Sequence, residues 1–323
     1  MNLRPLLSPR THPIYTGRYL LSTTETELMY EEVSRWIYTR SPGGIIYGRQ
    51  RIGKTNAIKF LQNHLPNEFG TDLPVFLVLC QEYKNANENV FFEDLLRNVR
   101  HPLASTSSRA SIKRERLYNF LVDKGVKSVE RRIVIILDDA QRLKSQHYEW
   151  LMDIYNELYR YGIEMTVILV GQRELKQTKD SFISVNKAQI VGRFMVHEHE
   201  FFGLRTLEDV TSCLVGYDLE IMFPPDSGCS LTQYFFPELF ENGFRLSNMA
   251  QDIYESFVDL RKEVGLYNAI EIPMQYFTRT IEYILTTYGV EGQNVPELTI
   301  SQIHDAIRYT NFLESEISAS KFV

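Results

Sequence analysis

The sequence predicts an α/β fold built on a parallel five-stranded sheet, followed by a helical region. Three observations support this prediction. Short β-rich segments alternate with helical segments up to about residue 203, a glycine-rich loop follows the first of those segments, and helical periodicity alone continues afterwards. Such alternation is typical of a parallel sheet whose two faces are covered by helices.

The expected strands are strongly apolar. Runs such as "IVIIL" show no polar alternation, which suits strands that are buried on both faces. The expected strands are residues 43–47, 74–79, 132–137, 165–170 and 195–202. The expected helices between them are 53–65, 88–100, 110–124, 144–160 and 172–180. The helices expected after the last strand are 206–218, 231–240, 246–264, 271–288 and 299–313.

The pattern divides the chain into four parts. Residues 1–21 are proline-rich and aperiodic, so we expect an extended arm. A helix should then begin at Thr24, because Glu27 follows three residues later as in a capping box. Its inward side chains should be Leu28, Val33, Trp36 and Ile37. The expected parts are an arm (1–21), a nucleotide-binding α/β domain (22–204), a helical lid (205–265) and a C-terminal helical extension (266–323).

Composition bounds the class of protein. The 323 residues are 44% hydrophobic and 24% charged, as in ordinary globular proteins. The net charge of -6 gives no overall attraction to nucleic acid, so any such contact must come from a local basic patch. Cys80, Cys213 and Cys229 lie far apart without metal spacing, which favours reduced thiols. We find neither a secretory signal nor a membrane-length apolar run, and expect a cytoplasmic protein without a membrane partner.

The segment "GRQRIGKT" (48–55) matches the phosphate-binding pattern G-x-x-x-x-G-K-[ST]. Lys54 should reach the β and γ phosphates of ATP, and the Thr55 hydroxyl should coordinate Mg²⁺. A chance glycine turn is the alternative, but an expected strand before the loop and a helix after it argue against that. The expected nucleotide-binding residues are Gly48, Arg49, Gln50, Arg51, Ile52, Gly53, Lys54, Thr55 and Asn56.

Two further strand ends carry polar side chains. In "RRIVIILDDAQRL", Asp138 should hold Mg²⁺ and Asp139 should polarise the attacking water. Asp139 is one methylene shorter than the glutamate that many ATPases place there, so hydrolysis is expected to be slow. The alternative for Asp139 is a helix N-cap. Gln172, after the fourth strand, could orient the water or could merely open the next helix.

These motifs, with "VILVGQREL", "IVGRF" and "FFGL", resemble an AAA+ ATPase, and more narrowly the transposition regulators TnsC, TniB and MuB, over about residues 22 to 260. The resemblance implies an ATPase in which Arg193 of "GRF" reaches the ATP of a neighbouring subunit. It also implies that Arg245 contacts the γ-phosphate within its own subunit. The alternatives are a surface ion pair for Arg193 and a solvated residue in a helix's first turn for Arg245.

A local reversal of charge lies in "RNVRHPLASTSSRASIKRER" (97–116), which holds six cations and one acid. The resemblance implies that this segment faces duplex DNA. Sequence-independent contact with the backbone is expected, because no aromatic residues interleave with the cations. The alternative is a solvated helix face with a serine loop. The candidate DNA-binding residues are Arg97, Arg100, Ser107, Ser108, Arg109, Lys113, Arg114 and Arg116.

The resemblance implies a regulator of DNA transposition and recombination that forms a ring or helical filament on duplex DNA when ATP binds. It would link a target-selection protein to the transposase, and hydrolysis would disassemble it. The alternative is a nucleotide-gated signalling scaffold that does not bind DNA. A small-molecule kinase is disfavoured by the long helical tail. A metal site at His197 and His199 is disfavoured because no third ligand is evident.

Overall fold

The computed structural model describes residues 4–8 and 10–321, so the ends of the predicted arm and of the predicted extension, with residue 9, lie outside the described residues. The chain divides into two compact units. The α/β unit comprises Leu28–Gln50 and Lys54–Phe201. The helical unit comprises the residues up to Glu27, Arg51–Gly53, and the residues from Phe202 onwards.

The α/β unit contains one parallel five-stranded sheet, as predicted. Its strands are β1 (Gly43–Tyr47), β2 (Val75–Leu79), β3 (Arg132–Asp138), β4 (Glu164–Gly171) and β5 (His197–Glu200). Their order is β2-β3-β4-β1-β5, so β1, β3 and β4 lie inside and β2 and β5 form the edges. β1 and β3 are buried along their whole length, which explains their unbroken apolar runs.

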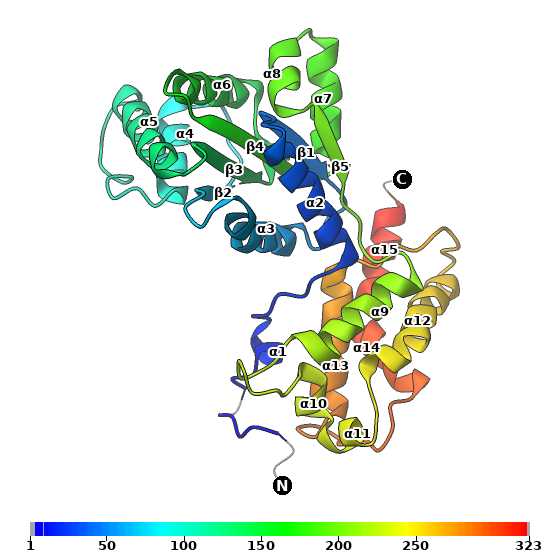
Figure 1. The fold of residues 1–323 in the computed structure, drawn as a ribbon. Coiled ribbons are helices and arrows are strands. Elements are labelled where there is room, and N and C mark those ends of the chain that lie inside the picture. The colour runs from blue at the N-terminus through cyan, green and yellow to red at the C-terminus, as the bar shows by residue number, and fades with distance from the viewer. Residues whose placement is uncertain (1–3, 9, 322–323) are drawn as a thin grey trace. The chain divides into compact units, whose positions relative to one another are not determined.

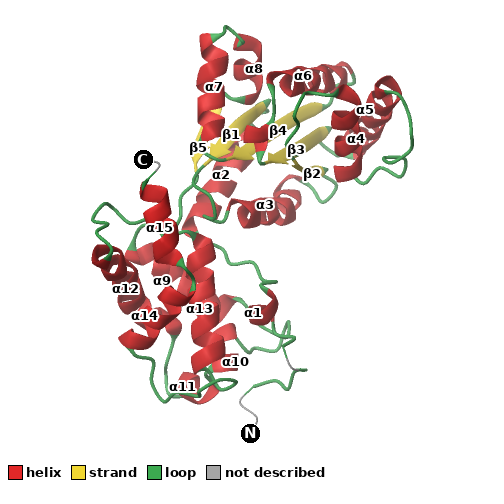
Figure 2. Ribbon diagram, turned by 180° about the vertical axis from the view of Figure 1, so that it is seen from behind, coloured by secondary structure: helices red, strands yellow, loops and turns green. Residues whose placement is uncertain are grey.

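Helices cover both faces of this sheet. α2 and α3 lie on one side, and α4, α5 and α6 lie on the other (Figures 1 and 2). The helices are α2 (Thr24–Tyr38), α3 (Lys54–Phe69), α4 (Glu88–Asn98), α5 (Ala110–Lys127), α6 (Ser145–Arg160), α7 (Glu174–Ser184) and α8 (Ala188–Phe194), with a 3₁₀ turn η1 (Ala140–Arg142). Only α8 was not expected from the sequence among these helices; it is short and buries Ile190 and Phe194 one turn apart.

A glycine of β1 makes room for an aromatic side chain of α2. A Cβ on Gly44 would lie 2.6 Å from the Trp36 ring, so any larger residue at position 44 would displace that ring. The buried apolar side chains of α2 are Met29, Val33, Trp36 and Ile37. The prediction that Leu28 points inward is wrong, because its side chain is 46% exposed and helix spacing places Met29 on the buried face instead.

The helical unit begins with part of the predicted arm. Residues Pro13–Thr16 form a one-turn helix, α1, that buries Ile14. The later elements are α9 (Leu207–Val215), the π turn η2 (Gly216–Glu220), α10 (Leu231–Phe235), α11 (Pro237–Glu241), the 3₁₀ turn η3 (Leu246–Met249), α12 (Ala250–Glu263), α13 (Met274–Tyr288), α14 (Ile300–Tyr309) and α15 (Phe312–Ser320). The helix expected at 231–240 is divided in two, because Pro237 has no N–H to continue it.

One hydrophobic core serves the whole helical unit. It runs from Ile14 of α1 through Phe257 of α12 and Phe277 of α13 to Phe312 of α15. Among the described residues, side chains of the predicted lid and of the predicted extension pack in this same core. Within it, Arg261 of α12 and Glu316 of α15 form an ion pair at 3.0 Å, with side chains only 5% and 4% exposed.

All three cysteines are buried free thiols. Burial raises the pKa of Cys80 and of Cys213 to about 12, so both thiols stay protonated in the folded chain. Within the described residues, no helix is long and apolar enough to cross a membrane.

Each unit contains a fully buried histidine whose ring accepts a hydrogen bond from the backbone at the start of a helix. His147 Nδ1 accepts from the Lys144 N–H at 2.8 Å, and His12 Nδ1 accepts from the Ile14 N–H at 3.4 Å. Burial lowers the pKa of both rings to about 4. Protonation would add a charge without water around it and would remove both cap bonds, because a protonated Nδ1 can no longer accept.

We expect acid to destabilise the fold through these two rings. Each folded-state pKa lies below the unfolded value of about 6.5, so the unfolded chain binds the extra proton more readily. The stability that each neutral ring contributes is present above about pH 6.5 and is lost as pH falls toward about 4; at about pH 5 each ring should cost about 2 kcal/mol. Urea unfolding at about pH 7 and about pH 5 measures this loss of stability in the wild type and in the variants His147→Asn and His12→Asn. Asparagine keeps a hydrogen-bond acceptor but does not titrate, so each variant should lose less stability in acid. An equally steep loss of stability in both variants would contradict the prediction.

Candidate functional site

The glycine-rich loop joins the carboxyl end of β1 to the start of α3. Gly53 has a φ of 109°, a conformation that favours glycine, and Arg51 also adopts a positive φ of 64°. The Lys54 ammonium donates to the Gly48 carbonyl at 2.8 Å and to the Arg49 carbonyl at 2.5 Å. The lysine therefore lies folded over its own loop, where phosphate oxygens could replace the two carbonyls.

The structure brings Thr55 and Asp138 together, although 83 residues separate them. The Thr55 hydroxyl donates to Asp138 Oδ2 at 3.2 Å, and the Asp139 N–H donates to Asp138 Oδ1 at 2.9 Å. Burial raises the pKa of Asp138, an effect that the hydrogen bonds from Asp139 N–H and Thr55 and the charge of Lys54 oppose. A buried carboxylate beside a hydroxyl is an environment that a bound cation would stabilise.

The donor set fits magnesium. Mg²⁺ prefers oxygen ligands and is usually bound through one or two carboxylates, substrate phosphates and water. The Thr55 hydroxyl and the Asp138 carboxylate supply two such oxygens beside the loop, at the carboxyl ends of the strands. Among the described residues, no group of three or more His, Cys, Asp or Glu side chains is arranged to hold a metal ion.

A chain of hydrogen bonds connects the ends of β3 and β4 with the loop. Gln141 Nε2 donates to Asp139 Oδ1 at 3.0 Å, and Gln141 Oε1 accepts from the Gln172 N–H at 3.1 Å. The Gln172 side-chain oxygen accepts from Gln50 Nε2 at 2.7 Å. Gln172 therefore lies beside the loop, as expected for a residue near the phosphates. Asp139 has a left-handed backbone conformation with a φ of 57°.

Gln141 and Arg142 were not identified as site residues from the sequence. Arg142 Nη2 lies 3.3 Å from Asp139 Oδ2, and Arg142 Nη1 donates to the Cys80 carbonyl at 3.2 Å. The signal that could have found them is their place in "DDAQR", one residue past the two acidic residues. Two of their partners, however, are Cys80 directly after β2 and Gln172 directly after β4, which only the folded sheet brings near.

The two arginines expected to contact ATP have partners within their own units. Arg193 in α8 donates to Asn156 Oδ1 at 2.7 Å and lies over the Tyr155 ring of α6 at 4.7 Å. Arg245 precedes η3 rather than lying within a helix, and donates to the carbonyls of Phe240 and Phe244 at 2.9 and 2.7 Å. Their contacts with ATP stay predictions.

Ion pairs engage much of the basic segment (97–116). Glu93 of α4 pairs with Arg97 and with the buried Lys113, whose hydrogen bond lowers the pKa of Glu93. Glu88 pairs with Arg114 at 3.1 Å. Arg116 donates to the Thr106 and Ser108 hydroxyls and thereby fixes the serine loop.

Two cations of this segment remain fully available. In the part of the chain that the structure describes, Arg100 and Arg109 are exposed, and no ion pair engages either. They flank the loop that carries the exposed Ser107. The other cations of the segment have ion-pair or hydrogen-bond partners within the chain, and contact of this segment with DNA stays a prediction.

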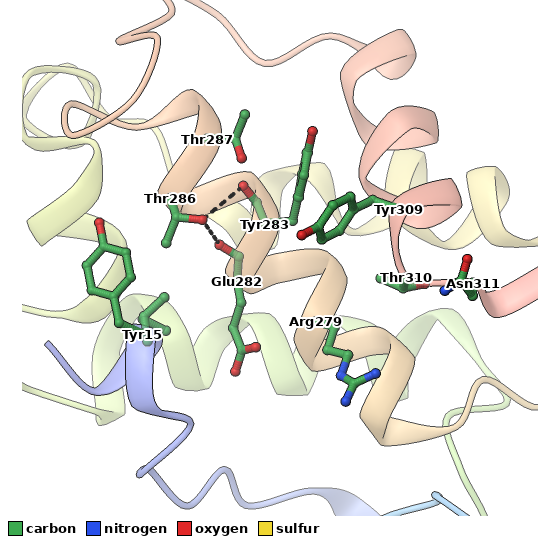
Figure 3. Close-up of a pocket in the computed structure, with 10 residues that line it drawn as sticks. Tyr15, Arg279, Glu282, Tyr283, Thr286, Thr287, Tyr309, Thr310 and Asn311 are labelled. Atoms are coloured by element: carbon green, nitrogen blue, oxygen red, sulfur yellow. Dashed lines mark hydrogen bonds between the residues drawn. The ribbon is translucent and has the colours of Figure 1, made fainter. Parts of the chain in front are cut away.

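A polar pocket of about 680 Å³ lies within the helical unit. Figure 3 shows Arg279, Glu282 and Tyr283 of α13 lining it together with Tyr309 and with Tyr15 of α1. Burial raises the pKa of Glu282, whose carboxylate accepts from the Tyr19 hydroxyl at 2.8 Å. None of its lining residues comes from the phosphate loop or from β3 and β4, so it is not the predicted nucleotide site.

Among the described residues, His197 and His199 of β5 belong to no group of three or more His, Cys, Asp or Glu side chains that could hold a metal ion. The His197 ring stacks on Trp36, with ring centroids 5.6 Å apart. Glu198 between them pairs with Lys179 of α7 instead. The strand is partly exposed, as expected, since Glu198 is exposed and His197, His199 and Glu200 are partly buried.

The sheet order, the loop after β1 and the acidic end of β3 define the α/β P-loop fold of the AAA+ type, with a helical region after it. Residues 39–178, less than half of the chain, match the family model described as an AAA domain. No curated protein sequence matches the chain.

Among solved structures, the chain is similar to the Aeropyrum pernix ORC2 protein in ADPNP–ADP complexes, at 13% identity and a TM-score of 0.57, over 93% of this chain and 71% of that one. It is also similar to domain III of the Thermotoga maritima replication initiation protein DnaA, at 16% identity and a TM-score of 0.49, over 95% and 99% of the two chains. Identities this low show a shared fold alone.

Proposed function

We propose that this chain binds ATP with Mg²⁺ at the loop after β1, hydrolyses it, and uses the bound nucleotide to control its assembly on duplex DNA. The observation that carries the proposal is the pairing of the Thr55 hydroxyl with the Asp138 carboxylate beside Lys54. A fold shared with a protein whose structure holds ADPNP and ADP supports the nucleotide part.

The residues of the site have separable tasks in this proposal. Lys54 leaves the carbonyls of Gly48 and Arg49 and pairs with the β and γ phosphates. Thr55 and Asp138 hold Mg²⁺, which neutralises charge on the phosphate oxygens when bound. Backbone N–H groups of the loop and the positive end of α3 add further stabilisation of the anion.

Asp139 and Gln172 act on the attacking water in this proposal. The Asp139 carboxylate accepts the proton of a water whose oxygen bonds to the γ phosphorus while the bond to the ADP oxygen breaks. Gln172 orients that water from the end of β4. Arg193 of a neighbouring copy and Arg245 of the same chain contact the γ-phosphate, because a permanently charged planar guanidinium suits that task.

More narrowly, we propose a regulator of DNA transposition in which assembly on DNA connects a target-selection protein with a transposase, and hydrolysis disassembles it. The resemblance of "VILVGQREL", "IVGRF" and "FFGL" to TnsC, TniB and MuB supports this choice. Arg100, Arg109 and Ser107 are the proposed contacts with the phosphate backbone, because these three of the candidate DNA-binding residues are exposed and have no ion pair among the described residues.

Electron microscopy of the protein with a non-hydrolysable ATP analogue and duplex DNA tests the proposal. Rings or filaments that require both ligands are the expected result. Protein that binds the analogue but stays monomeric with DNA would contradict the DNA part and leave the nucleotide part intact.

Reversing the charge of Arg100 or Arg109 should weaken binding to duplex DNA of any sequence, because each would contact a phosphate. Each lost contact should reduce the slope of log affinity against log salt concentration by about 1. Fluorescence anisotropy over a salt series measures both quantities. Arg40→Glu is the matched control for Arg100→Glu, since both arginines are exposed and have a positive φ, 56° and 57°. Equal affinity and slope in Arg100→Glu, Arg109→Glu and the control would refute the assigned surface.

A nucleotide-gated scaffold that does not bind DNA is the second candidate. The ion pairs of Arg97, Lys113 and Arg114 with α4 favour it, since paired cations attract phosphate less strongly. ATP-dependent assembly that is indifferent to DNA would select this candidate.

A further inference from the structure

Gln141 connects the acidic end of β3 with the end of β4. It lies in η1, three residues past the last residue of β3, and its side chain is partly buried. Its amide nitrogen donates to Asp139 Oδ1 at 3.0 Å, while its amide oxygen accepts from the Gln172 N–H at 3.1 Å. The amide nitrogen and the amide oxygen of Gln141 therefore bond to residues that follow two different strands, β3 and β4.

The end of β4 is shaped to receive this amide. A Cβ on Gly171 would lie 2.4 Å from Gln141 Oε1, which is closer than any ordinary contact. Even alanine at position 171 would therefore have to push Gln141 away from the Gln172 N–H. Gly171 and Gln141 are thus sterically matched.

The second oxygen of the Asp139 carboxylate, Oδ2, faces Arg142. Arg142 Nη2 lies 3.3 Å from Asp139 Oδ2, and the Cys80 carbonyl accepts from Arg142 Nη1 at 3.2 Å. Asp139 therefore has a neutral donor on one oxygen and a cation beside the other. A side chain with only two rotatable bonds that is held at both oxygens has little freedom to turn.

We propose that Gln141 is a positioning residue for ATP hydrolysis, holding the Asp139 carboxylate in register with Gln172 at the end of β4. The inference rests on the proposed function, in which Asp139 accepts the proton of the attacking water. Misplacement of a catalytic group by about 1 Å can cost about 10²-fold in rate, so a bridge that fixes this carboxylate affects kcat strongly. ATP binding, which depends on the loop residues, does not require the bridge.

Gln141→Glu separates the two hydrogen bonds. It keeps an oxygen that accepts from the Gln172 N–H but places a second carboxylate against Asp139. We expect kcat to fall about 10- to 100-fold while KM and the Kd for ATP stay within about 2-fold of wild type. Gln141→Ala, which removes both bonds, should lower kcat in the same way. Gln177→Ala, an exposed glutamine on α7, is the control and should leave kcat unchanged.

A double-mutant cycle adds a readout that a general loss of stability would not produce. Gly171→Ala alone should lower kcat by displacing the amide, but in the Gln141→Ala background it should cost much less, because the clashing oxygen is gone. Thermal melting of each variant shows whether it is folded at the assay temperature.

The possible outcomes distinguish failure of the positioning role of Gln141 from failure of the proposed ATPase function. Wild-type ATP turnover with an unchanged kcat in Gln141→Glu overturns the inference and leaves the proposed function standing. A loss of ATP affinity that parallels the loss of kcat also overturns it, since Gln141 would then support the fold. Wild-type protein without ATP turnover contradicts the proposed function, and the inference falls with it.

Discussion

Replacing Lys54 by alanine is expected to lower ATP hydrolysis about 10²- to 10³-fold, the usual cost of removing one charge-stabilising group from a reacting centre. The Lys54 ammonium has two carbonyl partners in the loop, where the β and γ phosphates are proposed to lie. Binding of ATP should weaken as well, because the ammonium contacts phosphate before and during the reaction. Calorimetric titration with ATP and a steady-state phosphate assay measure the two effects.

Lys59→Ala is the matched control for this substitution. Lys59 lies on the same helix, is exposed, and makes only a 3.5 Å contact with Asn56 among the described residues. It should bind and hydrolyse ATP as wild type does. If Lys54→Ala matches its control in both assays, the loop is not the phosphate site and the proposed function fails.

The largest expected loss of stability comes from Glu316→Ala in the helical unit. Its carboxylate is the buried partner of Arg261, so its removal leaves a guanidinium inside the core without its counter-charge. Breaking a buried pair in this way typically costs about 3–5 kcal/mol of the free energy of unfolding. Urea unfolding followed by circular dichroism measures the change.

Two further variants serve as controls for the effect of Glu316→Ala. Glu263→Ala breaks the pair between Arg308 and Glu263, whose side chains are 49% and 54% exposed, and should cost less than about 1 kcal/mol. Arg261→Met combined with Glu316→Leu removes both charges and should recover most of the loss, since apolar side chains can replace a buried pair. Equal effects of Glu316→Ala and Glu263→Ala would refute the argument from burial.

Local patterns were enough to predict the sheet and the phosphate loop. The strands are continuous apolar runs, and the loop is a contiguous motif, so neither depends on knowing which distant residues meet. The end of β1 at Tyr47 was predicted to the residue, and the acidic end of β3 was placed correctly. The prediction that Thr55 and Asp138 would share a site agrees with their hydrogen bond.

Features that depend on pairing between elements could not be predicted in the same way. The basic segment looked uncompensated because Glu88 and Glu93 lie outside it, on a helix that folding brings against α5. The sequence does not predict a role for Gln141, because the backbone N–H that bonds to its side chain lies 31 residues later, at Gln172. Leu28 was assigned to the wrong face because two neighbouring apolar residues both fit the helical pattern, and only packing chooses Met29.

The buried cysteines give each unit an internal reporter of its own opening. Cys80 lies at the end of β2, where its N–H donates to the Asp138 carbonyl, and Cys213 lies in α9 with no exposed surface. Since a protonated, inaccessible thiol does not react with alkylating reagents, modification of either one requires its surroundings to separate first. The rate of labelling at Cys80 therefore follows the separation of the end of the edge strand β2 from the end of β3, which carries Asp138, while the rate at Cys213 follows the opening of the helical core.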